Sequence, residues 1–262
     1  MPTELITSAQ NPKIKRLLAL QKDSSLRREC GLFVVEGRRE LQHCLDAGFE
    51  LDSVFVCPAI YGPDSASLTA PRLFEVSGAV YEKIAYRGGT EGVIAEVKVR
   101  ERTLADLQLP ENPLIMVLEA VEKPGNLGAV LRSADAAGAD AVLVCDPLTD
   151  LYNPNLIRAS IGAIFTVPCV ACSSEEAIKW LQARGIQILT AQLQDSSLYY
   201  DCDLRKGTAL VMGTESTGLS QQWRAAATSH IRIPMLGALD SLNVSVSAAI
   251  LLFEAVRQRK SY

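Results

Sequence analysis

Three stretches in the second half of the chain repeat one design, an apolar run that passes through a glycine- or proline-containing turn into a helix. They begin at Leu114, Leu210 and Ile231. Apolar runs that alternate with helix-length segments predict parallel βαβ units. In such a sheet the carboxyl ends of the strands lie at one edge, where open α/β sheets bind ligands. The sequence therefore predicts an α/β domain whose loops gather around one site.

The last of these stretches, residues 231–249, reads IRIPMLGALDSLNVSVSAA and leads into an apolar helix. Ser241, Asn243 and Ser245 stand at the start of that helix. Small polar side chains and free backbone N–H groups at such a position suit a polar ligand. Taken alone, Ser241 or Asn243 is more simply a helix cap. The functional interpretation depends on the three stretches together.

The length and composition predict two domains. With 262 residues and 48% hydrophobic content, the chain can bury a sizeable core. We expect an N-terminal domain over 1–100, a charged and proline-containing linker over 101–112, and a C-terminal domain over 113–262. No run is long enough for a membrane span, and the first residues lack the apolar core of a signal peptide. We expect a cytoplasmic protein without membrane contact.

The charge distribution points to one basic segment on an acidic chain. The formal net charge is -4, which argues against a general nucleic-acid binder. Residues 11–39, however, hold eight basic and three acidic side chains, a local net charge of +5. A solvated helix face is the common meaning of such a run, and a phosphate-binding patch is the alternative. The candidate RNA-binding residues are Lys13, Lys15, Arg16, Arg27, Arg28, Arg38 and Arg39.

Cysteine and histidine usage predicts neither a metal site nor disulfides. The seven cysteines lie mostly in apolar surroundings, which is typical of buried reduced thiols. Cys169 and Cys172 form a C-x-x-C, but a second pair is missing and the chain has two histidines, His43 and His230. The G-x-G-x-x-G pattern of dinucleotide-binding dehydrogenases is also absent from the sequence.

Three motifs stand in a fixed order: KPGNLGAVLRSADAAGAD from Lys123, VMGTESTGLS from Val211 and IRIPMLGALDSLNVSVSAA from Ile231. Together they resemble the signature motifs of the SpoU family of RNA ribose 2'-O-methyltransferases, within the SPOUT superfamily. The N-terminal half is similar to the substrate-binding domain that precedes many of these enzymes and that itself resembles a small ribosomal RNA-binding protein. The resemblance implies an α/β fold with a deep trefoil knot, a homodimer, and S-adenosylmethionine as the methyl donor.

The resemblance also implies the site. The backbone of Gly213, Ile233 and Leu242 would hold the methyl donor, with Leu193, Met235 and Asn243 lining its pocket. Arg132 is the position often proposed to activate the ribose hydroxyl; since an arginine stays protonated, we interpret it as a phosphate clamp that also lowers the pKa of the hydroxyl. The catalytic positions are Asn126, Arg132, Glu215, Ser241 and Asn243.

Two positions depart from the usual family pattern. Lys123 stands where an aspartate is common, and Thr214 stands where an asparagine is common. Both are next to predicted site residues, so substrate choice or local geometry can differ. Structured RNA is the expected substrate, ribosomal RNA in preference to transfer RNA because of the N-terminal domain. The alternatives are a transfer RNA 2'-O-methyltransferase, a base methyltransferase, and a non-catalytic RNA-binding or ribosome-assembly protein.

Overall fold

The computed structural model describes residues 4–86, 91–214 and 217–260. The chain forms two compact units, one made of residues 1–101 with 150–162 and the other of residues 102–149 with 163–262. The segment 150–162 therefore packs with the first unit, although its place in the sequence is within the predicted C-terminal domain. The predicted domain limits stay a prediction. No helix in the described part of the chain is long and apolar enough to cross a membrane.

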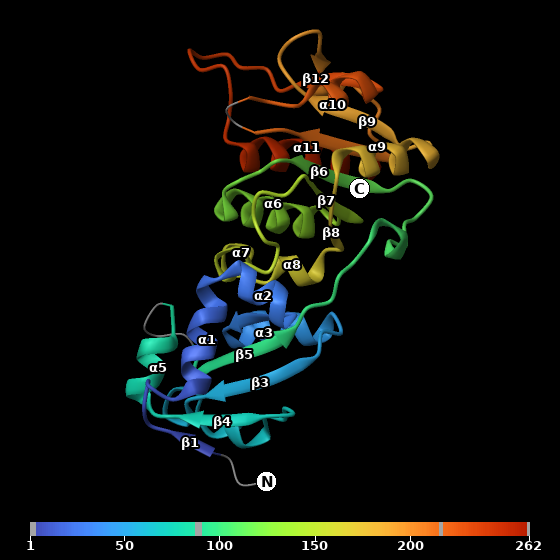
Figure 1. The fold of residues 1–262 in the computed structure, drawn as a ribbon. Coiled ribbons are helices and arrows are strands. Elements are labelled where there is room, and N and C mark those ends of the chain that lie inside the picture. The colour runs from blue at the N-terminus through green and yellow to red at the C-terminus, as the bar shows by residue number, and fades with distance from the viewer. Residues whose placement is uncertain (1–3, 87–90, 215–216, 261–262) are drawn as a thin grey trace. The chain divides into compact units, whose positions relative to one another are not determined.

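The first unit is a five-stranded mixed sheet, in the order β1-β4-β3-β5-β2, with helices packed against it (Figure 1). One face is covered by α1 and α5, whose buried side chains, among them Leu17 and Tyr81, join the strands in one core. Tyr152, next to α7, stacks on Phe33 of β2 with ring centroids 4.4 Å apart. The elements are β1 (Glu4–Ile6), α1 (Pro12–Lys22), α2 (Ser24–Cys30), β2 (Leu32–Glu36), α3 (Arg38–Asp46), β3 (Leu51–Val56), α4 (Pro58–Tyr61), β4 (Leu73–Val76), α5 (Gly78–Ile84), β5 (Val93–Lys98) and α7 (Pro154–Ala159).

The second unit is a seven-stranded sheet in the order β10-β12-β9-β11-β6-β7-β8, and each pair of neighbouring strands in this order is parallel. This confirms the predicted parallel α/β architecture. Figure 1 shows helices on both sides of this sheet. The elements are β6 (Leu114–Glu119), α6 (Pro124–Ala137), β7 (Ala141–Cys145), α8 (Ala163–Thr166), β8 (Cys169–Cys172), α9 (Ser174–Ala183), β9 (Gln187–Ala191), β10 (Ser197–Leu198), β11 (Thr208–Met212), α10 (Gln221–Ala226), β12 (Ser229–Arg232) and α11 (Val244–Arg259).

Packing explains why this sheet is stable. Strands β6, β7 and β11 are buried along their whole length, so both faces of the central sheet are covered. Trp223 of α10 and Leu181 of α9 belong to a core cluster on one face with Ile115 and Val117 of β6. Helices α6 and α11 pack against each other and contact β7, β6 and β11. The knot implied by the resemblance stays a prediction.

Two local predictions differ from the structure. The apolar run FTVPC, residues 165–169, has the pattern of a short buried strand and is predicted as one, but Phe165 and Thr166 end the short helix α8, and the strand β8 starts at Cys169. The predicted linker is not a free connector either, because Leu107 is buried in the core of the second unit and Thr103 and Asp106 form a capping box. Short apolar runs do not distinguish helix from strand, which explains the first error.

The first unit contains a buried carboxylate, Glu96 on β5. Only 3% of its side chain is exposed, and it accepts a hydrogen bond from Ser53 Oγ at 2.8 Å. Burial raises the pKa of the Glu96 carboxyl, since desolvation disfavours the charged form; Ser53 and Arg16 act in the opposite direction. A raised pKa in the folded state means that stability is greatest below the unfolded pKa and falls as the pH rises through the folded pKa.

We therefore expect Glu96→Gln to raise the free energy of unfolding at neutral pH. The amide keeps an acceptor for Ser53 and removes the buried charge. The difference from the wild type should shrink at acidic pH, where Glu96 is protonated. Denaturant titrations at pH 7 and pH 4 measure this, with Glu50→Gln as the control, because Glu50 is exposed and Lys98 lowers its pKa. Equal stability of Glu96→Gln and wild type at both pH values would contradict the prediction.

Candidate functional site

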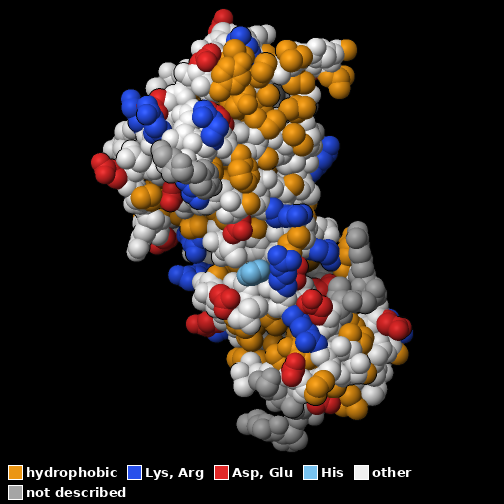
Figure 2. Space-filling model, turned by 180° about the vertical axis from the view of Figure 1, so that it is seen from behind, with side chains coloured by type: hydrophobic (Ala, Val, Ile, Leu, Met, Phe, Trp, Pro, Cys, Tyr) orange, Lys and Arg blue, Asp and Glu red, His pale blue; other side chains and the backbone are white. Residues whose placement is uncertain are grey.

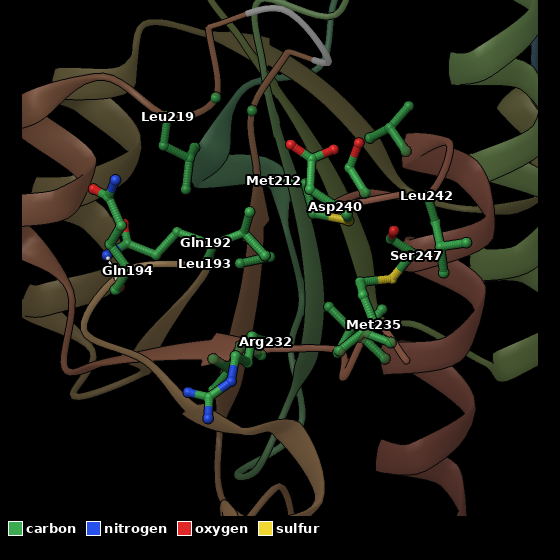
Figure 3. A pocket seen from close by; sticks show the side chains of 18 of the residues that line it. Gln192, Leu193, Gln194, Met212, Leu219, Arg232, Met235, Asp240, Leu242 and Ser247 are labelled. Atoms are coloured by element: carbon green, nitrogen blue, oxygen red, sulfur yellow. Dashed lines mark hydrogen bonds between the residues drawn. The ribbon is translucent and has the colours of Figure 1, made fainter. Parts of the chain in front are cut away.

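A cavity of about 340 Å³ opens at the carboxyl ends of β9, β11 and β12, which are neighbours in the parallel sheet. The loops after these strands form its walls together with residues 240–242 and the first turns of α11. In Figure 3, Gln192, Leu193 and Gln194 lie on one side of the cavity, and Met235, Leu242 and Ser247 lie on the other. The site is thus at the sheet edge where the sequence predicted a ligand.

The structure brings the predicted cofactor-binding residues into this one cavity. Its lining includes Leu193, Gly213, Ile233, Met235 and Leu242, and the predicted catalytic residue Ser241. These residues come from three loops, those after β9, β11 and β12. Asn243, which was also predicted to line the pocket, is absent from this lining. The wall is largely apolar, with Met212, Leu219, Ile231 and Leu251 among its members. An apolar slot with a few polar groups suits the flat adenine of a nucleoside ligand.

Gly213 allows the backbone of the loop after β11 to fold back until residues 213 and 218 are in contact. A Cβ added at Gly213 would lie 2.3 Å from the carbonyl carbon and oxygen of Gly218, a distance that no real side chain tolerates. Gly218 itself has a φ of +67°, in the left-handed region that favours glycine. The backbone of residues 213 and 218 can therefore approach only because both are glycines.

A second, smaller hollow of about 180 Å³ shares Gly213, Thr214 and Val244 with the cavity. Asn126 and Lys123, at the start of α6, line this hollow. Asn243 connects the two: its Oδ1 accepts from Ser245 N at 3.0 Å, and its Nδ2 donates to Asn126 Oδ1 at 3.2 Å. Asn243 is thus the helix cap that the sequence suggested, and it also joins the last loop to the first motif.

Two predicted catalytic residues remain, Arg132 and Glu215. Arg132 is exposed on α6 and is absent from the residues that line either hollow in the described part of the chain. It is six residues after Asn126, which places the two side chains on different faces of the helix. Glu215 lies outside the described residues.

Several site residues were missed from the sequence. Glu119, at the end of β6, is 6% exposed and accepts from the backbone N–H of Ser220 at 2.8 Å, which ties the loop after β11 to the neighbouring strand. In the sequence, the indication of its role was that an acidic residue stands at the end of the apolar run LIMVLE. Gln192 and Arg224 also line the cavity, and each has a buried polar atom, Gln192 Oε1 and Arg224 Nε, without a partner in the described structure. No periodicity or motif singled them out.

These two atoms test whether the cavity fits a polar ligand such as S-adenosylmethionine. A buried polar atom without a hydrogen bond is costly unless a ligand or water satisfies it. One is a donor and the other an acceptor, and both line a largely apolar cavity. The lining therefore fits a molecule that combines an apolar part with polar or charged groups, as S-adenosylmethionine does.

In the first unit, four of the predicted RNA-binding residues are engaged with protein groups. Arg27 is only 3% exposed and donates to Asp150 Oδ2 at 2.7 Å and to Leu20 O at 2.7 Å. Arg16 pairs with Asp52 and Glu96 at 3.5 and 3.4 Å. Lys13 pairs with Glu4, and Arg38 stacks on Tyr61. The prediction of an accessible Arg27 is wrong, because its guanidinium is a buried anchor for the segment 150–162.

The other three predicted RNA-binding residues, Lys15, Arg28 and Arg39, are exposed. They lie on α1, α2 and α3 of the first unit. Exposed cations of this kind can contact phosphates without first breaking a buried ion pair.

The parallel sheet and the cavity at the carboxyl ends of its strands place this chain in the class of ligand-binding α/β proteins. Comparison with known families narrows it: the model of the SpoU rRNA Methylase family matches residues 113–253, and the model of the MRM3-like substrate binding domain matches residues 11–95. The chain belongs to the SpoU rRNA methylase family.

Comparison with individual proteins supports the same family. The chain is 35% identical over 175 residues to the 23S rRNA (uridine(2479)-2'-O)-methyltransferase of Streptomyces viridochromogenes, a match that covers 64% of this chain and 61% of that relative. A crystal structure of an RNA 2'-O ribose methyltransferase is 43% identical, with a TM-score of 0.84 and coverage of 97% of this chain and 99% of the other. An AdoMet-bound rRNA methyltransferase from Sinorhizobium meliloti is 30% identical, with a TM-score of 0.89 and coverage of 99% of both chains.

We expect Gly213→Ala to weaken binding of S-adenosylhomocysteine by about tenfold or more. The added methyl group would collide with the backbone of Gly218 and force the two ends of the loop after β11 apart. Isothermal titration calorimetry measures this. Gly125→Ala is the matched control, since a Cβ there meets no atom within 4 Å. The account of the loop fails if Gly213→Ala and Gly125→Ala bind the ligand equally well.

Proposed function

We propose that this protein transfers the methyl group of S-adenosylmethionine to a ribose 2'-hydroxyl of ribosomal RNA. The observation that carries the proposal is the cavity itself, which gathers five predicted cofactor-binding residues from separate loops beside a hollow that holds Asn126. Two of the relatives named above are named as RNA 2'-O-methyltransferases, and two carry ribosomal RNA in their names. Such a substrate would place the protein in the cytoplasm.

The chemistry assigned to the chain is to position the reacting groups and to lower the pKa of the 2'-hydroxyl, whose proton leaves to solvent as the methyl group is transferred and S-adenosylhomocysteine is released. S-adenosylmethionine supplies an already activated methyl group on a sulfonium. In our proposal the cavity between the loops after β9, β11 and β12 holds the adenosine part through the backbone of Gly213, Ile233 and Leu242. The hollow lined by Lys123, Asn126 and Thr214 receives the acceptor ribose. The two departures from the family pattern therefore lie where the substrate is selected.

Arg132 acts on the substrate in this proposal, not on the donor. A guanidinium stays protonated, so it serves as a clamp for the phosphate beside the target ribose and lowers the pKa of the 2'-hydroxyl by its charge. Its exposed position on α6, outside both hollows, agrees with a contact to an extended RNA substrate. Asn126, Ser241 and Asn243 position the reacting groups, and Glu215 stays a proposed member of the site.

We expect the full-length protein to methylate ribosomal RNA from cells lacking its gene, and nuclease digestion followed by mass spectrometry should identify a 2'-O-methylated nucleoside. Arg132→Lys should lower the single-turnover rate by about 100-fold while leaving S-adenosylhomocysteine affinity unchanged, because lysine keeps the charge but loses the two-pronged contact.

Arg184→Lys is the control for this experiment, since Arg184 lies over Trp180 at the end of α9, far along the chain from the motifs. Near-normal turnover of Arg132→Lys would overturn the clamp. A methylated base, or methylation of transfer RNA alone, would favour one of the alternative enzymes. Absence of S-adenosylmethionine binding would favour the non-catalytic alternative.

The RNA contact of the first unit is proposed for Lys15, Arg28 and Arg39, supported by their exposure. The ribosomal substrate is supported by the match of residues 11–95 to a substrate binding domain. Lys13, Arg16 and Arg38 would have to leave their protein partners to join this surface, which makes them weaker candidates.

A homodimer is also proposed, on the resemblance and on an apolar surface. Figure 2 shows apolar side chains gathered over part of the second unit. Val246 and Phe253, seven residues apart on α11, are 47% and 48% exposed. That spacing places both on one face of the helix. An exposed apolar helix face of this kind is typical of a surface that a partner covers.

We expect Phe253→Asp to convert a dimer into a monomer, because it places a charge in the apolar face of α11. Light scattering after size exclusion measures the mass. Leu148→Asp, which changes a leucine that is 62% exposed and lies outside α11, should leave the dimer intact. A wild-type protein that elutes as a monomer at micromolar concentration, or equal effects of the two variants, would contradict the assignment.

A further inference from the structure

Arg224 lines the cavity and carries a positive charge, but it has no role in the reaction proposed above. It lies on α10 and is partly buried, and its Nη2 is 3.7 Å from the point where a Cβ of Gly218 would lie. Its Nε is buried and has no hydrogen-bond partner in the described residues. In those residues Arg224 also forms no ion pair. A guanidinium held in this way can bind an anion that the described residues do not provide.

Gln192 offers the complementary group. Its Nε2 donates to Gln194 O at 2.9 Å, which fixes the orientation of the amide. Its Oε1 is then buried without a donor in the described structure. Figure 3 shows Gln192 and Leu219 on the same side of the cavity, and Leu219 follows Gly218, the residue beside Arg224. The cavity wall therefore carries an unused donor and an unused acceptor.

S-adenosylmethionine has one anionic group, the carboxylate of its methionine part, and an ammonium group next to it. We propose that Arg224 binds this carboxylate and that Gln192 Oε1 accepts a hydrogen bond from the ammonium. This assignment rests on the proposed function, because it requires S-adenosylmethionine in the cavity. An arginine and a carboxylate form paired, charge-assisted hydrogen bonds, which would satisfy Nε and one terminal nitrogen together.

Arg232 is the other arginine of the cavity wall. Its Nη1 already donates to Ser196 Oγ at 3.4 Å, and its place in Figure 3 is separate from Gln192 and Leu219. Arg232 therefore has the same charge and lines the same cavity, but it lacks an unused buried donor. It is the matched control for Arg224.

The test compares two ligands on the full-length protein by calorimetry. S-adenosylhomocysteine carries the amino-acid part, and 5'-methylthioadenosine carries the same adenosine and sulfur without it. We expect Arg224→Met to weaken S-adenosylhomocysteine binding by about tenfold or more, the loss typical of a charged hydrogen bond, and to leave 5'-methylthioadenosine binding within about twofold. Gln192→Leu should also lower the first affinity more than the second.

The controls separate the outcomes. Arg224→Lys should recover part of the lost affinity because it restores the charge, and Arg232→Met should change the two ligands equally. Equal losses for both ligands in Arg224→Met would show an effect on cavity shape and overturn the assignment. Unchanged binding of both ligands, or a selective loss in Arg232→Met instead, would also overturn it. If the wild type binds neither ligand, the proposed function itself fails.

Discussion

The close approach of Gly213 to Gly218 is the constraint on which the site depends. Three parallel neighbours, β9, β11 and β12, end at one edge of the sheet, so their loops must share a small space. The loop after β11 fits there because its backbone folds back where any Cβ would collide at 2.3 Å. Glu119 then ties the end of this loop to β6 through the N–H of Ser220. The cavity is a consequence of these backbone contacts.

The same sheet edge separates two chemical environments. The cavity is mostly apolar and holds two unused polar atoms, whereas the adjoining hollow is lined by Lys123, Asn126 and Thr214. The hydrogen bond from Asn243 to Asn126 joins the last loop to the first motif at this boundary. A donor molecule in one space and an RNA ribose in the other would meet beside Gly213, which both spaces share.

Much of this arrangement could be predicted from the sequence. Alternating apolar runs and helices predicted the parallel sheet. The family resemblance predicted Leu193, Gly213, Ile233, Met235 and Leu242, which do line one cavity. Motif positions could be placed because strand ends in a parallel sheet are fixed by the topology.

The remainder depended on tertiary packing, which a local pattern does not contain. Arg27 looks like an exposed cation in the sequence, but Asp150, distant in the chain, makes it a buried anchor. The run FTVPC is too short and too apolar to distinguish helix from strand. Gln192 and Arg224 gain their meaning only from atoms left without partners inside a cavity.

Hydrogen–deuterium exchange with and without S-adenosylhomocysteine tests the central claim most directly. If the loops after β9, β11 and β12 and the start of α11 surround one ligand, then the ligand should slow exchange in all four segments together, at residues 191–194, 212–214, 231–235 and 241–247. Protection confined to one of these segments, or found only in the first unit, would contradict a shared cavity for the methyl donor.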